Sequence, residues 1–191
     1  AVLAEATERG AERIAVSAEI ALAWQMHAEG DLHRAQSRGA SALARARAVG
    51  ASDLETDALT LLCDLRLDLG DAAEARVHAT ALEQLGERTG SGRIRAFAAW
   101  TAGRLALEEE RHVDARAAFE RGLELARATG SRNLEGVCMS GLAEALEATP
   151  RTVRYRDSGG ATRSARVKIP AGVRDGHEAH QPGARRLGGL R

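Results

Sequence analysis

Glycine recurs along this chain at a regular interval, and that interval limits the folds the chain can adopt. The glycines of one set lie forty residues apart: Gly10, Gly50, Gly90 and Gly130. Gly30 and Gly70 lie midway between them. A period near forty with a break at each half-period is typical of helix pairs stacked in an array. Each pair buries its apolar face only against its neighbours, so the pairs must form one continuous core.

Composition favours helices over a sheet. Apolar residues make up 44% of the 191-residue chain, but aromatic residues only 3%. A core of alanine and leucine fits packed helices better than a β-sandwich, which relies on aromatic and β-branched residues. We therefore expect an all-α fold over residues 1–149, with the end of an earlier helix closed by Gly10. The helices that follow are expected at about 11–29, 31–49, 52–69, 72–89, 92–109, 112–129 and 132–148.

Turn and cap residues refine these boundaries. Gly90 and Gly130 are expected at positive φ, where glycine is tolerated best. Ser52 with Glu55 predicts a capping box, and Asp71 with Glu74 predicts a related N-cap. At the next half-period Pro150 replaces glycine, so the array is expected to end there.

The pattern changes after Pro150. Val153 and Tyr155 alternate with arginines, a Ser-Gly-Gly turn follows, and Ala165, Val167 and Ile169 alternate with polar residues. This alternation predicts a short C-terminal β-hairpin. We expect three segments: a helical domain over 1–149, a β segment over 150–176 and a disordered tail over 177–191. The first carries 17 basic and 24 acidic residues, net −7, and residues 150–191 carry 10 and 3, net +7.

Small residues at fixed spacing give the helical region a family resemblance. Gly103, Ala115 and Phe119 lie 12 and 4 residues apart. The two small residues let antiparallel helices approach closely, and the aromatic ring fills the gap to the next pair. Over about 11–148 the chain resembles the tetratricopeptide repeat family, with a unit of forty residues, which implies a right-handed superhelix. Segments such as 44–50 and 123–130 resemble the helical sensor region of large LuxR/MalT-type bacterial regulators.

A second resemblance covers residues 152–176. The segment Val167–Gly176, with Ile-Pro followed by Gly-Val-Arg-Asp-Gly, resembles the C-terminal substrate-binding region of DnaJ-type co-chaperones. The His-Pro-Asp turn of a J domain and a Cys-x-x-Cys zinc module do not occur in this sequence.

The repeat spacing also predicts a binding surface. In tetratricopeptide repeats the first helix of each pair lines a concave groove. The resemblance therefore implies that one face of each first helix in this chain contributes to such a groove. The residues expected on this face are Trp24, Asp57, Asp64, Asp68, Phe97, Trp100 and Arg104. The aspartates favour a basic or apolar protein or peptide as the partner. The alternative is that both tryptophans are ordinary packing between repeats.

Several functions are not expected. The only lysine, Lys168, lies outside any glycine-rich loop, which excludes a Walker-type phosphate loop. No run approaches the roughly 20 apolar residues of a membrane span, and the N-terminus has no signal-peptide pattern. His177 and His180 lack a rigid frame for a metal, and Glu108, Glu109 and Glu110 indicate a solvated helix end. Cys63 and Cys138 are expected to be free core thiols in a reducing cytoplasm, too far apart for a disulfide.

The sequence thus predicts a non-catalytic protein–protein interaction module in the cytoplasm, with no cofactor, no metal, no direct nucleic-acid binding and no membrane contact. One alternative is a DnaJ-type co-chaperone fragment that binds unfolded protein. Another is a sensor piece of a LuxR-type transcription regulator. The helix-like start at Ala1 suggests a fragment of a longer protein.

Overall fold

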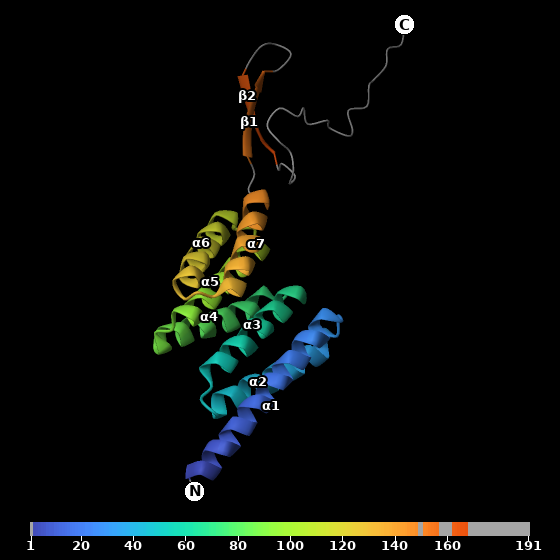
Figure 1. Ribbon diagram of the computed structural model, residues 1–191. Coiled ribbons are helices and arrows are strands. Elements are labelled where there is room, and N and C mark those ends of the chain that lie inside the picture. The colour runs from blue at the N-terminus through green and yellow to red at the C-terminus, as the bar shows by residue number, and fades with distance from the viewer. Residues whose placement is uncertain (1, 149–150, 157–161, 168–191) are drawn as a thin grey trace. The chain divides into compact units, whose positions relative to one another are not determined.

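The computed structural model describes residues 2–148, 151–156 and 162–167 (Figure 1). The chain divides into two compact units, Ala1–Thr149 and Pro150–Arg191. The described part of the first unit is built from α-helices alone. They are α1 (Val2–Ala28), α2 (Leu32–Ala48), α3 (Ser52–Asp68), α4 (Ala72–Thr89), α5 (Gly92–Glu108), α6 (His112–Ala128) and α7 (Arg132–Ala148). The prediction of an all-α fold is confirmed, and α2 to α7 lie at the predicted positions.

The turns follow the glycine period. Gly90 and Gly130 have φ of 66° and 68°, as predicted, and Gly30, Gly50 and Gly70 are also at positive φ. At the remaining half-period stands Glu110, which has a φ of 56° and is the one non-glycine residue at positive φ in the described chain. A left-handed residue directly after a helix lets the chain satisfy the last carbonyl groups and reverse direction. The regular spacing of glycine in the sequence thus corresponds to a regular spacing of left-handed turns in the structure.

Two of the predicted boundaries are wrong. Helix α1 runs through Gly10 without a break, because one glycine in a helix costs only about 1 kcal/mol relative to alanine and alanine and glutamate surround it. Ser52 is the first residue of α3 and Ala51 is the N-cap, with no side-chain cap hydrogen bond. The predicted cap at Asp71 is present, since its Oδ1 accepts a hydrogen bond from the Glu74 backbone N–H at 3.1 Å.

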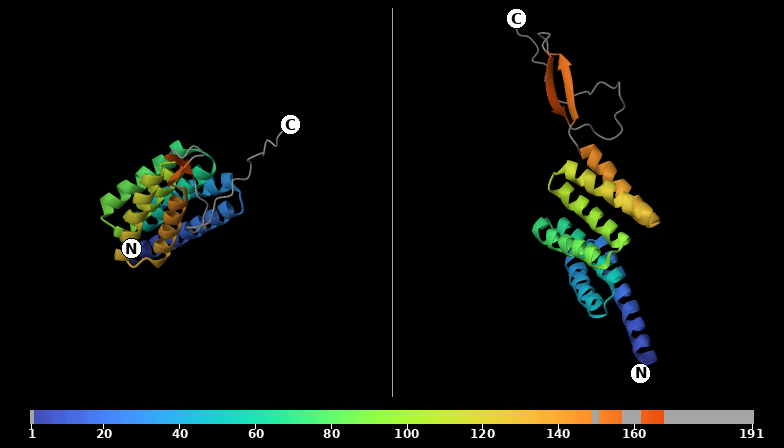
Figure 2. Two further views of the ribbon diagram at one scale, coloured as in Figure 1. Left: turned by 90° about the horizontal axis from the view of Figure 1, so that it is seen from above. Right: turned by 90° about the vertical axis from the view of Figure 1, so that its left-hand side faces the viewer.

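The helices of the first unit follow one another in chain order from α1 to α7 (Figures 1 and 2). Each helix packs on the next, and the odd-numbered helices also pack on one another: α1 on α3, α3 on α5, and α5 on α7. Even-numbered helices contact no other even-numbered helix. The odd-numbered helices therefore form the more closely packed of two layers.

Small residues set the helix spacing. The ring of Phe119 on α6 is fully buried between Gly103 of α5 and Gly141 of α7. A Cβ atom at either glycine would lie 2.6 Å or 2.5 Å from its Cε1 atom, so both helices approach the ring through bare backbone. In the preceding pair the Cys63 thiol donates a hydrogen bond to the Ala75 carbonyl at 3.5 Å. The predicted role of these small and aromatic positions in packing is confirmed.

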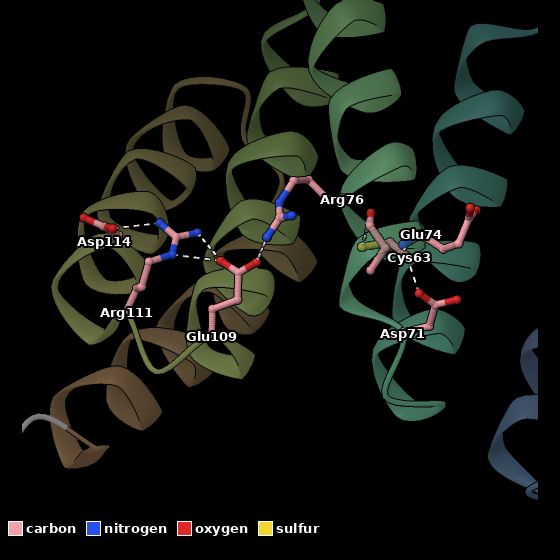
Figure 3. A network of polar contacts seen from close by, with 8 residues as sticks. Cys63, Asp71, Glu74, Arg76, Glu109, Arg111 and Asp114 are labelled. Atoms are coloured by element: carbon pink, nitrogen blue, oxygen red, sulfur yellow. Dashed lines mark hydrogen bonds and ion pairs between the residues drawn. The ribbon is translucent and has the colours of Figure 1, made fainter.

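An ion-pair network joins three consecutive helices at one turn (Figure 3). Glu109, the C-cap of α5, pairs with Arg76 of α4 and with Arg111, the N-cap of α6. Arg111 also pairs with Asp114 at 2.7 Å. Carboxylates at a helix C-terminus oppose the helix dipole, and here two guanidinium groups compensate the one at Glu109.

In the second unit the strands β1 (Arg151–Arg156) and β2 (Thr162–Val167) pair antiparallel. The register places Arg151 opposite Val167 and Arg156 opposite Thr162. The DnaJ-like residues 168–176 and the predicted tail 177–191, with His177 and His180, lie outside the described residues.

Candidate functional site

The predicted binding residues lie on three neighbouring odd-numbered helices. Trp24 is on α1, the aspartates are on α3, and Phe97, Trp100 and Arg104 are on α5. We call this set, together with His27 and Arg93, the odd-helix face. All three aromatic rings are half-buried. The structure thus places the predicted residues on adjoining helices, although their charges are not arranged as the sequence suggested.

Asp64 is paired with Arg104. Its residue is 4% exposed, and its Oδ1 atom lies 3.7 Å from Nη1 of Arg104. Burial raises the pKa of Asp64 to about 6, although Arg104 and His27 lower it. The Arg104 guanidinium in turn lies over the Trp100 ring, 5.6 Å from its centroid. The loss of hydration on burial outweighs the ion pair here, because it disfavours the charged carboxylate more than the attraction of one cation at 3.7 Å favours it.

Asp68 is paired with His27. Nε2 of His27 lies 2.5 Å from Oδ2 of Asp68. The His27 ring also packs against Trp24, with ring centroids 5.6 Å apart and an interplanar angle of 47°. Side-chain contacts therefore link α1 to α3 through His27 and Asp68, and α3 to α5 through Asp64 and Arg104.

Asp57 differs from the other two aspartates of the face. It is half-buried and forms no ion pair with any residue that the structure describes. Burial raises its pKa, which the nearby Arg93 lowers. The Arg93 guanidinium lies 5.6 Å from the centroid of the Phe97 ring. Beside Phe97 is a hollow of about 120 Å³ lined by Ser52, Asp53, Thr56, Ser91, Arg93, Ile94 and Phe97.

Pairing across repeats was not predicted, although the sequence contained its signal. Asp64 and Arg104 are forty residues apart, and so are Arg13 and Asp53, which form an ion pair of 2.8 Å between α1 and α3. His27 and Asp68 are separated by 41 residues. Opposite charges at one column of successive repeats lie next to each other once the odd-numbered helices pack. Asp64 and Asp68 therefore each have a partner on a neighbouring odd-numbered helix, and Asp57 is the one aspartate of the odd-helix face without an ion pair in the described chain.

Other candidate chemistry in the described residues is structural. Glu109 is held by two arginines. Burial raises the pKa of Cys63 to about 12 and of Cys138 to about 11, so neither thiol is a nucleophile at neutral pH. Both cysteines are free and buried, as predicted. The described residues contain no group of three or more His, Cys, Asp or Glu residues arranged for a metal ion. None of their helices is both long and apolar enough to cross a membrane.

No protein-family model matches this chain, and no curated protein matches it at a significant level. The resemblances to tetratricopeptide repeats, to LuxR-type regulators and to DnaJ-type co-chaperones therefore stay predictions.

Proposed function

We propose that this chain is a non-catalytic, tetratricopeptide-like interaction module that binds a protein or peptide on its odd-helix face. The observation that carries this proposal is the combination of half-buried aromatic rings with the unpaired Asp57 on adjoining helices. Aromatic side chains that are partly accessible, with polar groups on the same surface, are common anchors in protein interfaces. The inner sides of these rings pack against the buried core, and their remaining surface is available to a partner.

The chemistry of this face suits an apolar partner that carries one basic group. Arg104 and His27 already occupy the carboxylates of Asp64 and Asp68, so a strongly basic partner gains little there. Phe97, Trp24 and Trp100 offer apolar surface, and Asp57 offers one acceptor. The net charge of −7 over residues 1–149 disfavours direct nucleic-acid binding. We place the protein in the cytoplasm, where its buried thiols stay reduced, and propose neither a cofactor nor a membrane partner.

Two alternatives share the same helical unit. A DnaJ-type co-chaperone fragment is favoured by the antiparallel strands β1 and β2, which fall within the segment that resembles such proteins. A sensor piece of a LuxR-type regulator would use the odd-helix face in the same manner and differs only in the domains that accompany it.

The test uses a phage-displayed library of random peptides, selected against the full chain. An enriched peptide is then measured by calorimetry against Asp57→Lys and Phe97→Ala. The matched controls are Glu83→Lys on α4 and Val113→Ala on α6, which make similar changes at exposed positions of even-numbered helices. Circular dichroism verifies that each variant is folded.

We expect each variant of the odd-helix face to weaken binding roughly tenfold, about 1.4 kcal/mol, and each control to leave binding unchanged. Enriched peptides should carry apolar side chains and a lysine or arginine. Equal binding by the face variants and the controls would refute the proposed surface. Suppression of aggregation of a denatured protein by the full chain, lost on deletion of residues 150–191, would instead favour the co-chaperone alternative.

A further inference from the structure

The side of α1 that faces away from α2 and α3 carries no charge over four turns. At helical spacing its residues form one stripe, which we call the α1 stripe, and every one of them is exposed. They are Ala11, Ile14, Ala15, Ala18, Ala21, Leu22 and Gln25. Ile14 is 73% exposed and Leu22 is 45% exposed. The outer face of a surface helix normally carries charged residues, so this stripe is an unpartnered face.

The repeat shows what such a face does elsewhere in the molecule. The residues one, two and three periods after Ile14 are Leu54, Ile94 and Leu134, which are 7%, 5% and 1% exposed. Leu62, one period after Leu22, is 3% exposed. In α3, α5 and α7 this face packs on the preceding even-numbered helix. The α1 stripe is thus continuous in register with an interface that the fold forms three times.

The interface between α2 and α3 defines the helix that fits such a face. Gly39 of α2 comes so close that a Cβ atom there would lie 3.1 Å from Leu62 and 3.4 Å from Leu61. Around it α2 presents Ala35, Ala42 and Ala46, all fully buried. The covering helix must therefore be antiparallel and lined with small residues that allow close approach, with charges only where they are paired, as Arg47 of α2 is with Glu55 of α3.

We propose that the α1 stripe binds the α1 stripe of a second copy of this chain, antiparallel and around a two-fold axis at Ala18. This arrangement places Ala18 against Ala18 of the partner subunit, and Ile14 of each copy opposite the partner's Leu22. The alanines supply the small-residue seam and Ile14 and Leu22 supply the apolar bulk, so the surface is self-complementary. That is the requirement for a two-fold interface.

Electrostatics supports this occupant. No member of the α1 stripe is charged, and Glu12, Arg13 and Glu19 on the flanks of α1 already pair with Arg45 or Asp53 within the chain. Burial of an unpaired charge is strongly unfavourable. Dimer formation through the α1 stripe would not bury any of these three side chains unpaired. One helix from each copy gives an interface below the ~800 Å² per partner of a standard complex. We therefore expect a weak dimer, with Kd on the order of 10 µM.

Sedimentation velocity of the full chain over a range of concentrations tests this dimer. The test variant is the double substitution Ile14→Glu with Leu22→Glu. Its matched control is Val77→Glu with Val113→Glu, on α4 and α6, where the side chains are 58% and 75% exposed. A third arm, Met139→Glu with Leu146→Glu, tests the exposed side chains of α7, which are 55% and 43% exposed.

We expect the α1 variant alone to raise Kd at least tenfold while its circular dichroism spectrum is retained. Under mild oxidation, Ala18→Cys should form a disulfide-linked dimer and Val113→Cys should not, since Cys63 and Cys138 are buried and a disulfide needs Cα atoms within about 7 Å. The proposal would be overturned if the wild-type chain stayed monomeric or if no crosslink formed at position 18. It would also be overturned if the dimer survived the α1 substitutions or was lost equally in the α7 variant.

Discussion

Glu110 occupies a position that every other turn of its kind gives to glycine, and its replacement should stabilise the protein. Gly30 and Gly70 have φ of 83° and 74°, and Glu110 has a φ of 56°. The hydrogen bonds are also equivalent: Arg111 N–H donates to the Ala106 carbonyl at 2.8 Å, as Asp71 N–H does to Arg66 at 2.8 Å. Glu110 thus adopts the left-handed backbone conformation that glycine adopts at the other turns, although a side chain with a Cβ atom disfavours this conformation.

The size of the effect follows from two opposing terms. A left-handed conformation costs a residue with a Cβ roughly 1–2 kcal/mol. Glycine gives back about 0.4–1 kcal/mol, because it makes the unfolded chain more flexible. Removal of a carboxylate near the C-terminus of α5 adds a few tenths of a kcal/mol. We therefore expect Glu110→Gly to raise the free energy of unfolding by about 1 kcal/mol, which corresponds to a Tm increase of roughly 2–4 °C for a chain of this size.

Urea titration and thermal melts followed by circular dichroism measure this change. Glu108→Gly is the matched control, because it removes the same charge but introduces glycine at the last helical residue of α5, and it should destabilise by up to about 1 kcal/mol. Glu110→Ala separates charge from backbone conformation and should have little effect. A Glu110→Gly variant no more stable than Glu110→Ala would refute the argument that this turn is strained.

Two further predictions concern the packing and the buried charge. Gly103→Ala and Gly141→Ala should each lower stability by about 1–3 kcal/mol, since the Phe119 ring lies between the two glycines and cannot move away from either new methyl group; unchanged urea midpoints would contradict this packing. Because the pKa of Asp64 is raised to about 6, the folded state holds its proton more tightly than the unfolded chain. Stability should therefore fall as pH rises from about 4 to about 6, by roughly 3 kcal/mol at most. Asp64→Asn should flatten this dependence, and an unaltered pH profile in that variant would refute the assignment.

The helices could be predicted from the sequence because their ends depend on local signals. A left-handed turn needs glycine almost wherever it occurs, so Gly50 or Gly90 marks a helix end without knowledge of the fold. Gly10 was misread because glycine is only unfavourable inside a helix, and neighbouring alanines outweigh it. Glu110 was not recognised as a left-handed residue because its side chain carries no sign of that conformation.

The environment of the proposed binding residues was harder to predict because it depends on contacts between repeats. Spacing along one helix correctly placed Asp64 and Asp68 on α3, but it did not show that Arg104 and His27 are their partners. Reading the forty-residue columns across neighbouring repeats would have paired Asp64 with Arg104. The lack of an ion pair at Asp57 has no such signal, because Phe97 stands at the equivalent position of the next repeat.

The most direct test of the proposed interaction surface is site-specific photo-crosslinking to a peptide enriched by selection on the full chain. The photoreactive residue p-benzoylphenylalanine is placed at Phe97 on the odd-helix face or at Val113, which is 75% exposed on α6. If the odd-helix face binds the partner, the peptide crosslinks at position 97, excess unlabelled peptide prevents it, and no crosslink forms at position 113. Equal crosslinking at both positions, or crosslinking at position 113 alone, would contradict the account.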